Sequence, residues 1–352
     1  MIYLSKLKRS IVPQVFNQAS SIEGALRLNL NELPYDPSPR VKKRLETFDT
    51  SALGEYCSSA QNLAQIVAQK YGLGKENVLI TSGVDNSLGL CFATFFDQND
   101  SLALSEACNG EYRSLMHTYG IIHKKIELAR DGKNKIDDYL NIDDARGILI
   151  CNPNFPTSQM ISRLDMVNII EKNSDKIIIV DESYGEFSNC SVINFLAQFP
   201  NLIILKSFTK AYGLAGVRCG FALGNQDLIA ALKDVQTSLC SFPDDTLAQV
   251  VAGEALQDDK YLNQCVDKIL KTRSDFSDKL IGLGFEVLPS NTNFVLAKTS
   301  KKLASEIAFQ LRENKIIVKT FKTLRIADYL LITIGTDEQM NSVCAAMKKI
   351  LN

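Results

Sequence analysis

Short runs of aliphatic residues recur along this chain, and patterns typical of helices separate them. The runs are ENVLI (76–80), GILIC (147–151), DKIIIVD (175–181), NLIILKS (201–207) and GFALG (220–224). Helical stretches, with apolar residues three and four positions apart, lie at residues 63–72, 85–96, 162–173 and 226–239. Runs without polar alternation are typical of strands that are covered on both faces. The pattern therefore predicts an α/β fold with a doubly wound, mostly parallel sheet.

The domain organisation follows from the length and from a change of pattern near Pro243. At 352 residues the chain exceeds the usual size of one domain, about 100–200 residues. After Pro243 a long helical stretch over 245–283 precedes short apolar runs and two further helices. We expect an N-terminal arm over residues 1–27, a large domain over 28–240 and a small α+β domain over 241–352.

The charge balance restricts the class of partner. The sequence has 39 Lys and Arg against 40 Asp and Glu, which gives no electrostatic reason to expect nucleic acid or an anionic membrane as a partner. No stretch approaches the roughly 18–20 apolar residues of a membrane span, and the N-terminus lacks the apolar core of a signal peptide. We expect a cytoplasmic protein that acts on small molecules.

Cysteine and histidine usage predicts no metal site. The nine cysteines include no C-x-x-C pair, so we expect reduced, mostly buried thiols. His117 and His123 border the stretch MHTYGII (116–122), which we interpret as a strand region, and we expect both to be structural.

One lysine, Lys210, follows the run NLIIL in the stretch SFTKAYGLAGVRCGF (207–221). Ligands of open α/β sheets bind beyond the carboxyl ends of the strands, where Asp181, Asn152 and Gly83 also follow apolar runs. A lysine among apolar neighbours can lose its proton and attack a carbonyl, and a buried aspartate needs a cationic partner. Pyridoxal phosphate offers both an aldehyde for Lys210 and a ring nitrogen for Asp181.

A phosphate group needs its own binding site. Residues Ser82, Gly83 and Val84 lead into the predicted helix at 85–96, whose first free N–H groups can bind an oxyanion. Hydroxyl groups of the lysine loop and the guanidinium of Arg218 offer further contacts. The hydroxyls belong to Ser207 and Thr209.

Eight motifs occur in an order that is typical of one enzyme family. They are LNLNELPYDPSP (28–39), LGEYCSS (53–59), ITSGVDNS (80–87), CNPNFPTS (151–158), VDESYGEF (180–187), SFTKAYGLAGVRCGF (207–221), NTNFVL (291–296) and LLITIGT (330–336). With these motifs, which run through almost the whole chain, the sequence resembles the fold-type I pyridoxal-phosphate enzymes, and among them the histidinol-phosphate aminotransferases. The resemblance implies a transaminase of amino-acid biosynthesis.

The resemblance also implies a role for each matching residue. Lys210 forms the Schiff base with the cofactor and shuttles the proton, Asp181 pairs with the pyridine nitrogen, and Tyr184 bonds the phenolic oxygen of the cofactor. The phosphate is bound by Gly83, Val84, Ser207, Thr209 and Arg218. Tyr56 reaches the phosphate from the neighbouring subunit, which implies a homodimer. Asn31 is a further candidate for a substrate contact.

Two departures from the family pattern concern the cofactor. In CNPNFPTS, Phe155 stands where the family has the asparagine that binds the phenolic oxygen, and Asn154 comes one residue earlier. Either Asn154 takes over that contact or Tyr184 alone holds the oxygen. In ACNGEY (107–112), Asn109 replaces the aromatic ring that stacks on the cofactor, which leaves Tyr112.

A third departure concerns the substrate. Leu331 stands where the family has the arginine that binds the α-carboxylate, and an apolar side chain cannot replace a guanidinium. Lys319 and Arg325 are possible substitutes, although both are also compatible with ordinary surface cations.

Three functions are compatible with these residues. The first is an aminotransferase for a small, phosphorylated amine or amino acid, because histidinol phosphate carries no α-carboxylate. The second is a decarboxylase of a phospho-amino acid, such as threonine or serine phosphate. The third, a cofactor-binding protein without catalysis, agrees with the changes at Phe155, Asn109 and Leu331 but not with the intact Lys210 and Asp181.

Overall fold

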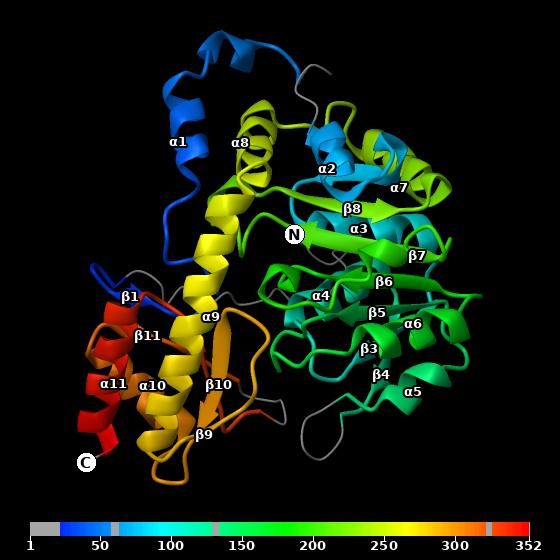
Figure 1. Ribbon diagram of the computed structural model, residues 1–352. Helices are drawn as coiled ribbons and strands as arrows, with labels where there is room; N and C mark the ends of the chain where they lie inside the picture. Colours follow the sequence, from blue (N-terminus) through cyan, green and yellow to red (C-terminus); the bar gives the residue numbers. More distant parts are fainter. Residues whose placement is uncertain (1–21, 58–62, 129–133, 322–325, 352) are drawn as a thin grey trace, which may run out of the picture.

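The computed structural model describes residues 22–57, 63–128, 134–321 and 326–351. Within these ranges no helix combines the length and the apolar character that crossing a membrane requires. Figure 1 shows two sheets of unequal size, with the long helix α9 (Asp259–Gly282) running beside the smaller one.

The larger sheet has seven strands in the order β2-β8-β7-β6-β5-β3-β4. In that order the strands are Val78–Thr81, Gly220–Gly224, Leu202–Ser207, Ile177–Asp181, Gly147–Cys151, Ser101–Ser105 and Ile122–Ile126. All neighbouring pairs are parallel except those of β8, which is antiparallel to both β2 and β7. The expected mostly parallel sheet is confirmed.

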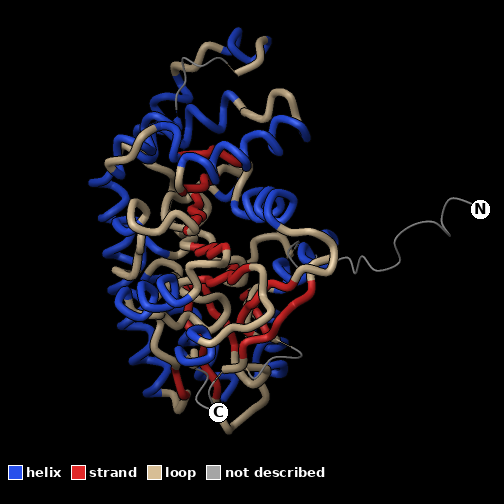
Figure 2. The backbone as a smooth tube through the Cα atoms, turned by 90° about the vertical axis from the view of Figure 1, so that its right-hand side faces the viewer, coloured by secondary structure: helices blue, strands red, loops and turns tan. Residues whose placement is uncertain are grey.

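Alternate side chains of these strands enter two different cores. In β6, Ile178 and Val180 belong to one apolar cluster, and Ile179 belongs to the other. The second cluster includes side chains of α3 (Val84–Phe95), α4 (Gly110–Tyr119) and α7 (Gln226–Leu239). The first includes those of α2 (Leu63–Tyr71), α5 (Ile136–Leu140), α6 (Arg163–Lys172) and α8 (Thr246–Leu256). Figure 2 shows strands in the interior with helices outside them, as in a doubly wound fold.

The smaller sheet has the order β12-β13-β10-β9. Its strands are Lys319–Thr320, Leu330–Thr333, Phe294–Lys298 and Glu286–Val287, and α9, α10 (Ala304–Glu313) and α11 (Asp337–Leu351) pack around it. The N-terminal segment joins this part of the molecule, because β1 (Leu26–Arg27) pairs in parallel with β11 (Ile316–Ile317). The domain boundary between residues 240 and 241 stays a prediction.

Several elements differ from the sequence-based expectation. Residues 116–122 are not a strand region: α4 continues to Tyr119 and ends where Gly120 adopts a left-handed conformation, and β4 follows. The predicted helical stretch 245–283 is two helices, because the side chain of Asp258 caps a new helix by accepting a bond from the Tyr261 amide. Strands β3 and β4 were not predicted, because their lysines, serines and histidine interrupt the apolar pattern.

The segment between β1 and α2 contains α1 (Pro39–Glu46) and the 3-10 helix η2 (Thr50–Gly54). Helix α1 lies beside α8 in Figure 1. Pro39 occupies the first turn of α1, where its missing N–H is no loss, and the Ser38 hydroxyl caps the helix.

Candidate active site

A cavity of about 450 Å³ lies at the carboxyl ends of β6 and β7. It is lined by Asn29, Leu30, Asn31, Val84, Asp85, Asn109, Glu111, Tyr112, Phe155, Asp181, Ser183, Tyr184, Ser207, Thr209, Lys210, Arg218 and Lys319. These residues come from both sheets and from the N-terminal segment. The structure therefore brings most of the predicted site residues together from widely separated motifs.

Lys210 lies in the loop that follows β7. Its Nζ donates a hydrogen bond to the Leu30 carbonyl at 3.1 Å and lies 5.7 Å from the centre of the Tyr184 ring. Desolvation lowers the pKa of Lys210 to about 8, although the nearby carboxylates of Glu111 and Glu32 act in the opposite direction. A lysine with this pKa is partly uncharged near neutral pH and can attack a carbonyl.

Asp181 ends β6 and is buried. Its Oδ1 accepts hydrogen bonds from the Ser183 amide at 2.8 Å and from the Ser183 hydroxyl at 2.5 Å. Its Oδ2 accepts one from the Tyr112 hydroxyl. Burial raises the pKa of Asp181, and these hydrogen bonds act against that shift. Both carboxylate oxygens are thus held by donors.

Tyr184 is held by the N-terminal segment. Its hydroxyl accepts a hydrogen bond from Nδ2 of Asn31 at 2.9 Å, and Oδ1 of Asn31 accepts one from the Thr333 hydroxyl at 3.0 Å. Asn293 bonds the Asn31 carbonyl at 3.0 Å. Asn31 therefore connects the large sheet to the small one at the edge of the cavity.

The predicted phosphate site lies at the N-terminus of α3. Gly83 caps this helix with a φ of 95°, and a Cβ there would lie 3.2 Å from Nη2 of Arg218. Glycine is favoured here by both the backbone conformation and the close guanidinium. Arg218 pairs with Asp85 at 3.1 Å, and the Ser207 hydroxyl accepts a bond from the Thr209 amide at 3.0 Å.

The small sheet contributes Lys319 to the cavity, and no arginine among the described residues of that sheet lines it. Lys319 and Leu331 are cross-strand partners in β12 and β13, but Leu331 is fully buried in the core and only Lys319 reaches the cavity. The ammonium of Lys319 lies 4.9 Å from the centre of the Phe155 ring. Desolvation lowers the pKa of Lys319, while Glu111 acts in the opposite direction.

Among the predicted residues that the structure describes, Gly83, Asn154 and Tyr56 do not line the cavity, although Gly83 lies beside the lining residue Arg218. The amide of Asn154 bonds the Ala107 carbonyl at 2.9 Å and the Thr157 hydroxyl at 2.8 Å, so both of its amide hydrogens have partners within the protein. Tyr56 is 72% exposed and stacks on Phe242, outside the cavity. Arg325 lies outside the described residues.

Asn109 and Tyr112, from the motif that supplies a stacking ring in the family, both line the cavity. The structure gives each a different contact. Asn109 caps α4, with its side-chain oxygen accepting a bond from the Glu111 amide. Tyr112 is buried and directs its hydroxyl to Asp181.

Sequence reasoning did not identify Glu111, Ser183 or the Leu30 carbonyl. Ser183 had a usable signal, because a serine two positions after a strand-end aspartate is placed to bond its carboxylate. Glu111 and Leu30 had none, because only the tertiary fold brings them to Lys210.

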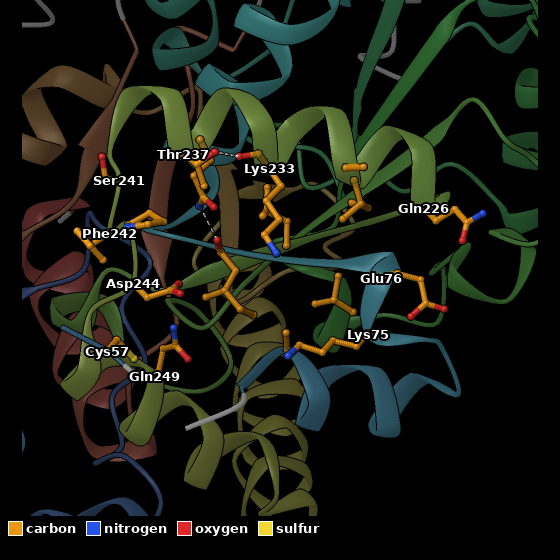
Figure 3. A pocket seen from close by; sticks show the side chains of 18 residues that line it. Cys57, Lys75, Glu76, Gln226, Lys233, Thr237, Ser241, Phe242, Asp244 and Gln249 are labelled. Atoms are coloured by element: carbon orange, nitrogen blue, oxygen red, sulfur yellow. Dashed lines mark hydrogen bonds between the residues drawn. The ribbon is translucent and has the colours of Figure 1, made fainter. Parts of the chain in front are cut away.

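Another cavity of about 690 Å³ lies beside β2 and α7, and it does not contain this chemistry. Figure 3 shows Lys75, Glu76, Lys233 and Asp244 among the side chains around it. None of the residues predicted to contact the cofactor lines this second cavity. The smaller cavity is therefore the candidate active site.

Comparisons with known proteins agree with this site. Residues 23–347 match the family of class I and II aminotransferases. The chain belongs to this family. It is 37% identical over 344 residues to the histidinol-phosphate aminotransferase of Lactococcus lactis subsp. cremoris, with 97% of this chain and 96% of the relative covered.

Solved structures have the same fold. The histidinol-phosphate aminotransferase of Sinorhizobium meliloti, solved with pyridoxal-5'-phosphate, superposes with a TM-score of 0.84 at 23% identity, covering 93% of this chain and 90% of that one. The L-threonine-O-3-phosphate decarboxylase of Porphyromonas gingivalis gives a TM-score of 0.79 at 22% identity, covering 93% and 99%. The expected fold-type I architecture is confirmed.

The residues of the cavity fit pyridoxal 5'-phosphate. An amine with a lowered pKa, a buried carboxylate and a glycine-capped helix N-terminus with a guanidinium lie in one cavity. They match, in turn, the aldehyde, the ring nitrogen and the phosphate of the cofactor. This aminotransferase uses pyridoxal phosphate, which supplies an electron-withdrawing ring to the reaction.

Proposed function

We propose that this aminotransferase acts on histidinol phosphate or a closely similar phosphorylated amine. The observation that carries the proposal is that the small sheet contributes the cation Lys319 to the cavity, whereas Leu331 is buried in the core. A substrate that has a phosphate and no α-carboxylate needs an anion site there, but not the guanidinium that recognises a carboxylate with two parallel bonds. The names of the relatives support the same substrate.

In this proposal Lys210 carries the cofactor and moves the proton at the substrate carbon. Asp181 holds the ring nitrogen, Tyr184 bonds the phenolic oxygen, and Asn31 orients the Tyr184 hydroxyl. Gly83, Val84, Ser207, Thr209 and Arg218 bind the cofactor phosphate. Their places around one cavity support these roles.

Lys319 binds the phosphate of the substrate and, in the second half of the reaction, a carboxylate of the amino donor. Its ammonium has no ion-pair partner within 4 Å among the described residues, although Glu111 is close enough to raise its pKa. A partly desolvated cation of this kind gains more from an anion than a solvated surface lysine does.

The experiment is a panel of amines tested on the protein loaded with pyridoxal phosphate. Histidinol phosphate, histidinol, glutamate, phosphoserine and phosphothreonine are each added, and the cofactor spectrum and released carbon dioxide are followed. Conversion to pyridoxamine phosphate by histidinol phosphate, without carbon dioxide, supports the proposal. Carbon dioxide from phosphothreonine or phosphoserine, with the cofactor unchanged at the end, would establish a decarboxylase instead.

We also propose that the enzyme is a homodimer in which Tyr56 completes the partner's site. Five large apolar side chains are exposed on neighbouring segments, from η2 to the start of α8: Leu53, Tyr56, Leu239, Phe242 and Leu247. The rings of Tyr56 and Phe242 stack with centres 3.8 Å apart, although both are more than half exposed. A grouped apolar surface of this kind is typical of a protein interface.

A mixing experiment tests the shared site. Tyr56→Ala and Lys210→Ala variants are each nearly inactive in this proposal, but a hybrid dimer has one site with an intact Lys210 and an intact Tyr56. Mixing the unfolded variants and refolding them together should restore part of the wild-type activity. Absence of restoration in hybrids verified by mass spectrometry would overturn the shared site.

A further inference from the structure

The carboxylate of Asp181 is held from two directions by residues outside its own strand. Ser183, in the loop after β6, donates two hydrogen bonds to Oδ1, and Tyr112, on α4, donates one to Oδ2. All three residues are buried. The Tyr112 hydroxyl also lies 3.7 Å from the sulfur of Cys151, so it is enclosed between β5 and β6.

These donors stabilise the negative charge of the buried Asp181 carboxylate. Asp181 has no ion-pair partner among the described residues. The titratable groups that face it are Tyr112 from α4, Cys151 from β5, Asp85 from α3 and Tyr184 from the loop after β6. None of them is a cation. Burial without a cation favours the neutral acid, whereas hydrogen bonds donated to a carboxylate favour the charged form.

We propose that Tyr112 and Ser183 are positioning residues that keep Asp181 ionised, and fix the direction of its oxygens, before the cofactor binds. The inference builds on the proposed contact between Asp181 and the ring nitrogen. Tyr112 acts as the donor and not as a base, because burial and the adjacent carboxylate raise its own pKa. The phenol therefore keeps its proton throughout the reaction.

The consequence concerns the strength of the cofactor as an electron acceptor. A carboxylate stabilised by three donors is a weak base, so the shared proton stays on the ring nitrogen. If the two hydroxyl donors are removed and only the Ser183 amide remains, Asp181 holds a proton of its own and can no longer stabilise a positive ring nitrogen.

The matched control is Tyr139. This tyrosine is as buried as Tyr112, and its hydroxyl lies 3.5 Å from Oδ1 of Asn134 without a bond to Asp181. Tyr139→Phe removes a buried phenolic hydroxyl without changing the contacts of the carboxylate.

The experiment measures the protonation of Asp181 directly, by infrared difference spectroscopy of the full-length protein before and after pyridoxal phosphate is added. The carboxylic-acid band is assigned with Asp181→Asn. The proposal predicts no such band at pH 7 in the wild type or in Tyr139→Phe, and a clear band in the Tyr112→Phe, Ser183→Ala double variant. With cofactor and substrate, kcat of the double variant should fall by at least about tenfold, the lower end of the value of a single hydrogen bond to a charged group, while KM stays within about twofold.

An acid band in the wild type at pH 7, or its absence in the folded double variant, would overturn the proposal. If the double variant does not fold, as judged by circular dichroism, the single variants are measured in its place and the same two results decide. The infrared measurement before cofactor addition does not depend on the substrate, so a wrong substrate under the proposed function leaves this test intact.

Discussion

The two walls of the active-site cavity differ in how firmly their residues are held. On the cofactor wall, Asp181 and Tyr184 are buried and bonded by neighbours from other elements, and Lys210 bonds the Leu30 carbonyl. On the side of the cavity that the small sheet contributes, Lys319 contacts the ring of Phe155 and has no ion pair within 4 Å among the described residues. Leu331, at the position where the resemblance predicts an arginine, is buried in the core and does not line the cavity.

This difference indicates that chemistry and substrate choice are separable in this fold. The residues proposed to hold the cofactor end strands or follow them directly, so the sheet fixes their positions. Lys319 belongs to a two-residue strand of the small sheet. We therefore expect changes at Lys319 to act mainly on which anion is bound, although its charge also contributes to the lowered pKa of Lys210.

The largest expected effect is on the cofactor wall. Lys210→Ala should lower kcat by roughly 10³–10⁴-fold, because it removes both the attachment of the cofactor and the group that transfers the proton. Steady-state transamination and the visible absorbance of the cofactor measure this. Lys233→Ala, beside the other cavity, is the control and should keep both (Figure 3). Retained absorbance in Lys210→Ala would contradict the account.

Asp181→Asn should lower kcat by roughly 10²–10³-fold, the range for the loss of one preorganised electrostatic contact. The amide keeps the size of the side chain but cannot stabilise a positive ring nitrogen. Single-turnover kinetics at saturating substrate separate this effect from binding. A loss that appears only in KM would place Asp181 on the substrate side and remove the distinction between the two walls.

A smaller effect is expected from Lys319→Met, which should raise KM for histidinol phosphate by roughly 10–100-fold and change kcat little, since a hydrogen bond to a charged group contributes about 1.5–3 kcal/mol. Histidinol, which lacks the phosphate, should be affected much less. Lys298→Met, whose lysine pairs with Glu286 on the same sheet, is the control. Equal losses for both amines would show that Lys319 does not recognise the phosphate.

The smallest effect is a pH shift. Because the pKa of Lys210 is lowered to about 8, the rate at which the protein binds pyridoxal phosphate covalently should rise with pH through about 8 and then level off. Glu111→Gln removes the largest influence that raises this pKa, so the midpoint should move below 8. Stopped-flow absorbance between pH 6 and about 10.5, the ordinary lysine value, measures both midpoints. A wild-type midpoint near that ordinary value would contradict the lowered pKa.

Sequence reasoning identified the fold and the candidate cofactor residues because both depend on local pattern. Aliphatic runs marked five of the seven strands of the large sheet, and polar residues at their ends marked Asp181 and Lys210. Strands β3 and β4 were missed because β3 reads SLALS and β4 reads IHKKI, and in both polar residues interrupt the apolar run.

Side-chain direction was harder to predict than position. Tyr112 was recognised only as the remaining aromatic residue of its motif, and the turn of α4 directs its hydroxyl to Asp181. Asn154 was considered as a substitute for the family asparagine, but its amide bonds Ala107 and Thr157. Such outcomes depend on contacts between segments far apart in sequence, which local patterns do not encode.

The most direct test of the account is to locate the lysine that carries the cofactor. The protein loaded with pyridoxal phosphate is reduced with borohydride, which makes the link to the lysine permanent, and the labelled peptide is identified by mass spectrometry. The account predicts one label per chain, on Lys210. A label on Lys319 or Lys206, or no label on a protein that still transaminates, would contradict it.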